Sequence, residues 1–318
     1  MRVLVTGAHG CVGAWVVKLL LDRGIEVIAF DREAEPARLK LIAPPAALAK
    51  VRIETGRIED GARLKALVKD EGVTHIIHLA AVLIPYCQAN PAAGAIANVA
   101  GTLNVFEAAR DAGRPVRIAY ASSAAVWGPQ DRYQDRPLTE ADNPEPATHY
   151  GVFKLANEAS ARVFYSAGGV SSAGLRPWSV YGVGRDAGLT ADPTHAMKAV
   201  AMGREYRMRL TGHMDLQYVE DVAEAFIRCA LAELPGAHVF NLAGEVASMS
   251  GLIRLLERLR PAAAGRITAE GPQVPVAYRM DNTSLRKAIP GLPLTPLEEG
   301  ARRTIEMFER LHGEGRLG

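Results

Sequence analysis

Hydrophobic positions in the first half of the chain follow two alternating periods. Short, β-branched apolar runs predict strands at about 2–6, 25–30, 51–54, 73–79, 116–121 and 170–175. Between them, apolar residues recur at helical spacing and predict helices near 12–23, 60–70, 91–112 and 149–167. Parallel strands joined by crossover helices are expected from this alternation, so the pattern predicts an α/β fold with a doubly wound parallel sheet.

The pattern changes after Arg176 and Pro177. Helices are predicted near 193–202, 219–232, 248–258 and 296–312, separated by short segments rich in Gly and Pro. We expect residues 1–176 to form one domain, to which 211–245 return with a further helix and strand. Residues 177–210 and 246–318 are then expected to form a smaller C-terminal cap that binds the substrate.

Composition limits the partners and the compartment. Of the 318 residues, 48% are apolar and 23% are charged, and the net charge is +2, so neither nucleic acid nor an anionic membrane is expected as the main partner. Residues 72–106 lack charge but include His, Pro and Asn, which argues against a membrane span. Three widely spaced cysteines and no secretory signal predict a cytoplasmic protein.

A glycine-rich turn follows the first predicted strand and opens the first helix. Gly7, Gly10 and Gly13 leave room for backbone N–H groups to approach a pyrophosphate at the helix N-terminus. Asp31 ends the second strand, where a carboxylate accepts hydrogen bonds from ribose hydroxyls and repels a 2′-phosphate. Arg32 beside it can hold such a phosphate. NAD is therefore the expected cofactor, and NADP is less favoured.

A second set of residues carries acid/base chemistry. Tyr150 and Lys154 are four apart on a predicted helix, so they share a face, and a cation near a phenol lowers the pKa of the phenol. Ser122 and Ser123 follow the fifth strand, at a carboxyl end where ligands of parallel sheets bind. These features converge on one cleft. Metal binding is not predicted, because His75 and His78 point to opposite faces of a strand.

Together these motifs resemble the extended branch of the short-chain dehydrogenase/reductase superfamily, the NAD-dependent epimerase/dehydratase family. The matching segments are Thr6-Gly-Ala-His-Gly-Cys-Val-Gly13, Asp31, Asp60, His78-Leu-Ala-Ala81, Asn98-Val-Ala-Gly-Thr-Leu-Asn104, Ser122-Ser-Ala-Ala-Val-Trp-Gly128, Tyr150-x-x-x-Lys154, Leu175-Arg-Pro177, Tyr181-Gly-Val-Gly-Arg185 and Leu297-Glu-Glu-Gly300. They cover nearly the whole chain.

The resemblance implies a Rossmann-type domain and a homodimer formed through the helices at 91–112 and 149–167. It implies that Tyr150 is the general acid/base, that Ser123 polarises the reacting oxygen, and that Lys154 binds the nicotinamide ribose and lowers the pKa of Tyr150. The expected cofactor contacts are Gly7, His9, Gly10, Cys11, Val12, Gly13, Asp31, Arg32, Asp60, Leu79, Ala80, Ala81, Asn98, Tyr150, Lys154 and Pro177. The expected substrate contacts are Ser122, Ser123, Trp127, Trp178, Ser179 and Arg185.

Departures from the family bear on the substrate. Met214 stands where members that bind nucleotide sugars carry an arginine, the segment 275–281 lacks their R-P-G-D run, and Ser179 replaces an asparagine. Loss of guanidinium groups weakens the hold on a diphosphate. We therefore expect NAD-dependent hydride transfer, as an oxidoreductase or epimerase, at a secondary alcohol of a small sugar-like or hydroxy-acid substrate. The alternatives are a nucleotide-sugar (UDP-sugar) 4-epimerase and a non-catalytic NAD(P)-sensing regulator.

Overall fold

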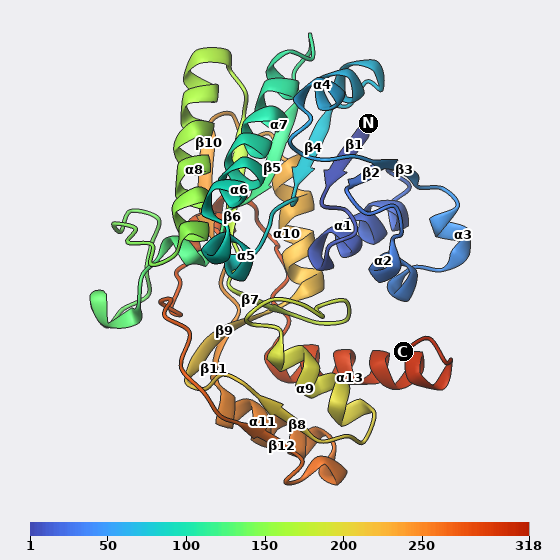
Figure 1. The fold of residues 1–318 in the computed structure, drawn as a ribbon, viewed down its shortest axis with the longest axis vertical. Helices are drawn as coiled ribbons and strands as arrows, with labels where there is room; N and C mark the ends of the chain where they lie inside the picture. The colour runs from blue at the N-terminus through green and yellow to red at the C-terminus, as the bar shows by residue number, and fades with distance from the viewer. Residues whose placement is uncertain (318) are drawn as a thin grey trace.

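The computed structural model describes residues 1–317, and a seven-stranded parallel sheet forms its centre (Figure 1). The strand order is β10-β6-β5-β4-β1-β2-β3, so the direction of winding reverses between β1 and β4. The strands are β1 (Arg2–Thr6), β2 (Glu26–Asp31), β3 (Arg52–Thr55), β4 (His75–His78), β5 (Arg117–Ala121), β6 (Ser172–Arg176) and β10 (Ala237–Asn241). The doubly wound parallel sheet predicted from the sequence is confirmed.

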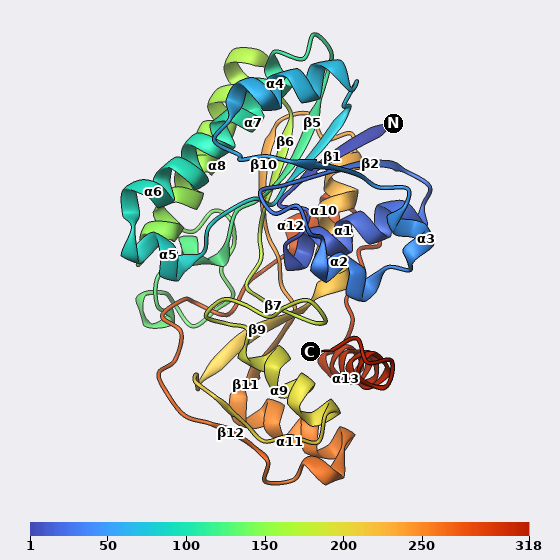
Figure 2. The same ribbon diagram turned by 45° about the vertical axis from the view of Figure 1, so that its right-hand side comes forward.

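Helices cover both faces of this sheet, as Figures 1 and 2 show. One face carries α1 (Cys11–Asp22) and α10 (Val219–Leu231), and the other carries α4 (Gly61–Asp70), α7 (Gly101–Arg110) and α8 (His149–Gly168). Successive residues of β1 alternate between the two: Val3 and Val5 belong to the hydrophobic cluster with α1, and Leu4 belongs to the cluster with α4 and α7. Both faces of the strand are buried, which explains its continuous apolar run.

The helix predicted over 91–112 is interrupted. It consists of α6 (Pro91–Ala95), one π-helical turn (Ile96–Ala100) and then α7. Asn98 lies in the π-helical turn and its side chain is turned away from the helix, accepting a hydrogen bond from Val82 N at 2.8 Å and donating to Val82 O at 2.9 Å. The periodicity of apolar residues does not predict a single π-helical turn inside a longer helix. Such turns are commonly found near functional sites.

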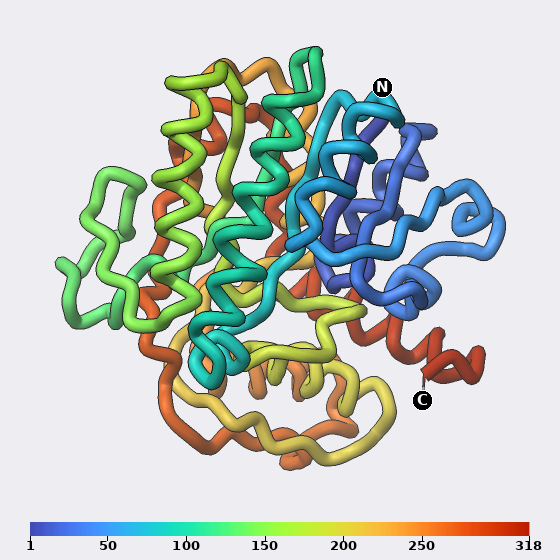
Figure 3. Tube along the Cα trace, turned by 45° about the horizontal axis from the view of Figure 1, so that its top comes forward, coloured from blue at the N-terminus to red at the C-terminus, as the bar shows by residue number. Residues whose placement is uncertain are grey.

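Below the sheet lies a smaller region (Figure 3). Its three-stranded sheet has the order β11-β9-β7, and β8 pairs with β12. Its elements are β7 (Ser179–Tyr181), α9 (Asp192–Ala201), β8 (Tyr206–Met208), β9 (His213–Tyr218), β11 (Glu245–Ser248), α11 (Met249–Leu259), β12 (Ile267–Ala269) and α13 (Leu297–Gly313). The short helix α12 (Thr283–Ala288) instead contacts β10 of the large sheet (Figure 2). Of the predicted returning segment 211–245, α10 and β10 join the large domain, whereas β9 pairs within the smaller sheet. The domain boundaries stay a prediction.

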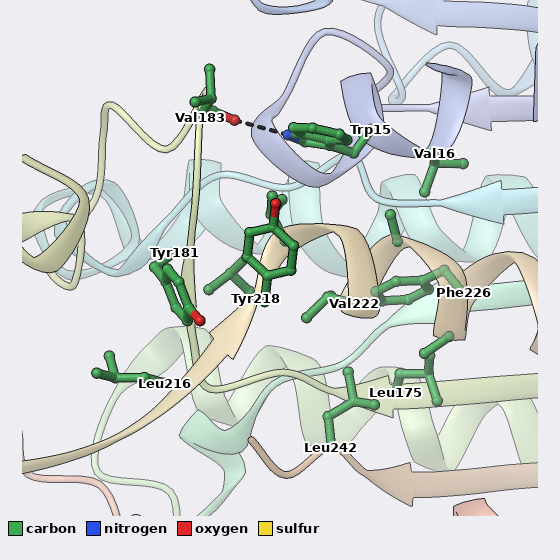
Figure 4. Packing of buried hydrophobic residues seen from close by; sticks show 14 of the residues in the cluster. Trp15, Val16, Leu175, Tyr181, Val183, Leu216, Tyr218, Val222, Phe226 and Leu242 are labelled. Carbon is green, nitrogen blue, oxygen red and sulfur yellow. Dashed lines mark hydrogen bonds between the residues drawn. The ribbon is translucent and has the colours of Figure 1, made fainter. Parts of the chain in front are cut away.

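One hydrophobic cluster joins the two regions (Figure 4). Tyr181 and Leu216 from the smaller sheet belong to the same buried cluster as Val222 and Phe226 of α10. This shared core fixes the smaller region beside the carboxyl ends of the large sheet. The remaining elements are short: α2 (Ala37–Ile42), α3 (Pro45–Leu48), α5 (Ile84–Ala89) and 3₁₀ turns at Ala124–Val126, Gln130–Arg132 and Pro261–Ala263. Across residues 1–317, no helix is long and apolar enough to span a membrane.

Candidate active site

The glycine turn between β1 and α1 is built for close approach. Gly7 has a φ of +70°, and a Cβ there would lie 2.5 Å from the backbone nitrogen of Ala80. A Cβ on Gly13 would lie 2.1 Å from the carbonyl oxygen of Gly7. Both positions therefore require glycine, and the N-terminus of α1 is left open to a ligand.

That turn forms one wall of a cleft of about 670 Å³ at the carboxyl ends of the strands. Asp31 ends β2 and accepts hydrogen bonds from the backbone nitrogens of His9 at 2.9 Å and Glu33 at 3.2 Å. The His9 ring is buried, and neither of its nitrogens has a hydrogen-bond partner among the described residues. A tight glycine turn and an acid at the end of the second strand, which both line the cleft, fit a dinucleotide.

Thirteen of the residues predicted for cofactor or substrate line this cleft. They are Gly7, His9, Gly10, Cys11, Val12, Gly13, Asp31, Arg32, Leu79, Ala80, Ala81, Pro177 and Arg185. The prediction for this group agrees with the geometry, and their roles toward NAD stay proposals.

Asp60 and Asn98 differ from the prediction because their side chains are used elsewhere. Asp60 is the N-cap of α4, where its carboxylate accepts a hydrogen bond from Arg63 N at 3.0 Å, and it does not line the cleft. Arg57 and Glu59 line the cleft in its place. Asn98 supports the cofactor loop from behind, through its two hydrogen bonds to Val82, which does line the cleft.

Three predicted catalytic residues converge at the start of α8 and the end of β5. Thr148 caps α8 by accepting a hydrogen bond from Gly151 N at 3.1 Å, so the helix presents Tyr150 and Lys154 from its first turns. Tyr150 hydrogen-bonds with Ser123, whose Oγ also accepts from Ala125 N at 3.1 Å. Lys154 Nζ lies 5.4 Å from the centroid of the Tyr150 ring and donates to Ala121 O at 2.6 Å.

Burial dominates the acid/base properties of these groups. It raises the pKa of Tyr150 to about 12, against opposing effects of the Ser123 hydrogen bond and the Arg185 charge. It lowers the pKa of Lys154 to about 8. The expected lowering of the Tyr150 pKa by Lys154 is therefore not found, because desolvation of the phenol outweighs the nearby charges.

Several predicted substrate contacts lie in the packed interior instead. Ser122 Oγ donates to Glu158 at 2.5 Å, Ser179 Oγ donates to Thr190 O at 3.3 Å, and Trp127 is fully buried. Trp178 is partly buried and donates from its indole nitrogen to Ala277 O at 2.7 Å. The prediction that Ser122, Trp127 and Ser179 face the substrate is corrected: sequence spacing located the strand ends but not the direction of these side chains.

A buried carboxylate, not anticipated from the sequence, holds the catalytic elements together. Glu158 of α8 pairs with Arg176 at the end of β6, with an O–N distance of 2.7 Å and side-chain exposures of 1% and 4%. Glu158 also accepts the Ser122 hydroxyl, and the Arg176 guanidinium lies 4.7 Å from the centroid of the Trp127 ring. The position of Glu158, four residues after Lys154, was a usable signal because it puts both on one helix face.

Glu158→Gln is expected to destabilise the fold by about 3 kcal/mol, since it leaves Arg176 buried without a partner charge. The negative charge of Glu158 also raises the pKa of Lys154, so its removal lowers that pKa further. Lys154 then loses its proton at lower pH, and the alkaline limb of the pH–rate profile moves toward acid. Thermal unfolding and a pH–rate profile test this. Glu107→Gln, on the exposed Lys65 pair, is the matched control, and an unshifted limb in Glu158→Gln contradicts the electrostatic role.

No group of three or more His, Cys, Asp or Glu side chains within residues 1–317 is arranged to hold a metal ion. Both ring nitrogens of His78 already form hydrogen bonds within the protein, one with the Thr6 hydroxyl at 2.7 Å and one with the Thr102 hydroxyl at 3.0 Å. Burial lowers the pKa of His78 to about 3, so the ring is neutral and structural.

Comparison with known proteins gives the family. The model of the NAD-dependent epimerase/dehydratase family matches residues 3–243. The UDP-glucose 4-epimerase of Mycolicibacterium smegmatis is 29% identical over 97% of this chain and 98% of its own length.

Solved structures agree on the fold. A Thermotoga maritima UDP-glucose 4-epimerase with UDP-glucose superimposes with a TM-score of 0.85 at 24% identity, over 98% of this chain and 100% of the other. The structure of MoeE5 in complex with UDP-glucuronic acid and NAD superimposes with a TM-score of 0.80 at 27% identity, over 98% of this chain and 99% of the other. The family model covers most of the chain, and the chain belongs to the NAD-dependent epimerase/dehydratase family of extended short-chain dehydrogenase/reductases.

Proposed function

We propose that the protein is an NAD-dependent 4-epimerase of a nucleotide sugar. The observation that carries the proposal is the end-to-end similarity to a UDP-glucose 4-epimerase, which includes the cap as well as the cofactor domain. This supports the alternative stated from the sequence over the small-substrate hypothesis. NAD, when bound, supplies a hydride acceptor and donor.

The side chains of the site suit this chemistry. Tyr150 can take a proton from a secondary hydroxyl and return it, and Ser123 can hold the oxygen that changes charge. Lys154, whose ammonium lies beside the Tyr150 ring, can bind a ribose hydroxyl. Epimerisation requires that the C4 hydrogen leaves as hydride and returns to the opposite face of the same carbon.

An anionic substrate needs a cation in the cleft, and Arg185 supplies one. Four arginines line the cleft; Arg32, Arg38 and Arg57 each pair with a carboxylate. Arg185 donates only to the Thr190 hydroxyl at 3.1 Å, and its buried Nε has no partner among the described residues. Met214, which stands in place of the family arginine, is fully buried in the hydrophobic cluster. We infer that Arg185 binds the anionic part of the substrate.

Arg185→Met is expected to raise the KM for the nucleotide sugar about 30- to 150-fold, because a charge-assisted hydrogen bond contributes about 2–3 kcal/mol. The kcat falls less, since Tyr150 and Ser123 are retained. Steady-state kinetics on UDP-glucose and UDP-glucuronic acid measure the split. Arg207→Met, on an exposed ion pair of the cap, is the control. An unchanged KM rules out the role assigned to Arg185.

The second candidate is a dehydrogenase of a small hydroxy acid, which the loss of an arginine at Met214 favours. The same purified protein, incubated with UDP-glucose, UDP-glucuronic acid and a panel of hydroxy acids, separates the two. An epimerase yields the 4-epimer by NMR with no accumulation of NADH, whereas a dehydrogenase yields an oxidised product and one NADH per turnover. The homodimer and the cytoplasmic location stay predictions.

A further inference from the structure

A loop of the cap closes one side of the cofactor cleft. It follows β7, spans residues 182–190, and extends toward α1 and α2 (Figures 1 and 3). Gly184, Arg185, Asp186 and Ala187 of this loop line the same cleft as the glycine turn. The loop and the turn therefore form facing walls around the place where the pyrophosphate is expected.

An ion pair ties these walls together. Arg38 of α2 donates to the Asp186 carboxylate through Nε at 3.0 Å and Nη2 at 2.7 Å. Its third nitrogen, Nη1, donates to the carbonyl oxygen of His9 in the glycine turn at 2.9 Å. The hydrogen bond with Asp186 raises the pKa of Arg38. One guanidinium thus links the cap loop, α2 and the glycine turn.

The cap loop is held at two places, and the Arg38–Asp186 ion pair is the more exposed of the two. Trp15 of α1 donates from its buried indole nitrogen to Val183 O at 2.9 Å, at the base of the loop (Figure 4). The Arg38 and Asp186 side chains are 32% and 54% exposed, so water can replace their contact. The base of the loop is fixed, and its outer part depends on the ion pair.

Charge gives the pair a further role. Without Arg38, the Asp186 carboxylate would face the cleft unpaired and repel the two negative charges of a pyrophosphate. Paired with Arg38, Asp186 holds the loop without that repulsion.

We propose that Arg38 and Asp186 form a clasp that retains NAD by holding the cap loop across the cleft. The pair controls how fast the dinucleotide leaves, and it touches none of the reacting atoms. A slow exchange suits an enzyme that regenerates its cofactor in each turnover. The proposal rests on NAD binding in this cleft and is independent of the substrate, so its failure leaves the proposed function intact.

The test is the rate at which bound NAD exchanges. Wild-type enzyme and variants are loaded with isotopically labelled NAD, diluted into excess unlabelled NAD, and sampled by rapid gel filtration and mass spectrometry. Asp186→Asn is expected to release NAD about five- to tenfold faster. This factor corresponds to an ion-pair energy at the upper end of the range for partly exposed pairs, as expected for a bidentate contact. Arg38→Met is expected to release it faster still, because Asp186 is left unpaired, and the double variant falls between the two.

Two further measurements separate the clasp from a general loss of structure. The exchanged pair, Arg38→Glu with Asp186→Arg, restores at least part of the retention. Added KCl speeds release from the wild type by screening the pair and has less effect on Asp186→Asn. Arg207→Met with Glu270→Gln removes an exposed ion pair elsewhere in the cap and leaves the exchange rate unchanged. Thermal unfolding checks that each variant is folded.

Three results would overturn the proposal that the Arg38–Asp186 pair retains NAD. If Asp186→Asn releases NAD at the wild-type rate while Arg38→Met releases it faster, Arg38 contacts the cofactor directly and there is no clasp. If neither variant changes the rate, the ion pair has no part in retention. Loss of retention in the exchanged pair equal to that in Arg38→Met also overturns the proposal.

Discussion

Tyr150→Phe is expected to lower kcat by about 10²- to 10⁴-fold, the range that one positioned acid/base group contributes. The variant keeps the ring beside Lys154 and loses only the hydroxyl that hydrogen-bonds Ser123. Because the ring still fills the same space, NAD binding and thermal stability are expected to change little. Turnover on the nucleotide sugar, measured with the amount of bound NAD in the same sample, separates chemistry from binding.

The matched control for this variant is Tyr165→Phe, on the exposed side of the same helix. It is expected to retain full activity. If Tyr150→Phe were as active as the wild type, the assignment of Tyr150 as acid/base would be wrong, and a non-catalytic, NAD-sensing role would become the better hypothesis.

Gly13→Ala is expected to weaken NAD binding about 5- to 150-fold, since overpacking at a closely packed position costs about 1–3 kcal/mol. The added methyl would lie 2.1 Å from Gly7 O and 2.9 Å from the Ala8 Cα. Backbone on both sides must move, and it is the same backbone that is expected to cradle the pyrophosphate. Calorimetric titration with NAD measures the loss, and thermal unfolding without NAD shows how much of the cost falls on folding.

Gly313→Ala provides the control, because a Cβ there meets nothing within 4 Å and the position is remote from the cleft. Equal NAD affinity in Gly13→Ala and wild type would show that the turn tolerates displacement and does not bind the pyrophosphate closely.

The sequence was sufficient for the centre of the large sheet because strands such as β1 and β5 are buried along most of their length and therefore form continuous apolar runs. The predicted strand at 2–6 coincides with β1, and the one at 116–121 with β5 (Arg117–Ala121). The short strands β8 and β12, of three residues each, carry no pattern long enough to detect. Their pairing is decided by tertiary contacts.

The site was predictable where backbone geometry dictates residue type and less so where side-chain direction decides. Gly7 and Gly13 are required by close contacts that only glycine permits, so the motif pointed to them directly. Asp60 and Ser122 lie at the expected helix and strand ends, but neither residue lines the cleft. Asp60 caps α4, and Ser122 donates a hydrogen bond to Glu158. Arg38 was not found because α2 is six residues long and has no periodic pattern.

The central claim, internal return of hydride by an NAD-dependent 4-epimerase, is tested most directly with UDP-glucose carrying deuterium at C4. The enzyme as purified is incubated without added NAD, and the product is analysed by NMR and mass spectrometry; UDP-glucuronic acid labelled at C4 is run in parallel. The expected result is the 4-epimer with its deuterium retained and no NADH released into solution. An oxidised sugar with deuterium transferred to released NADH, or no conversion of either sugar by enzyme that contains NAD, would contradict the claim.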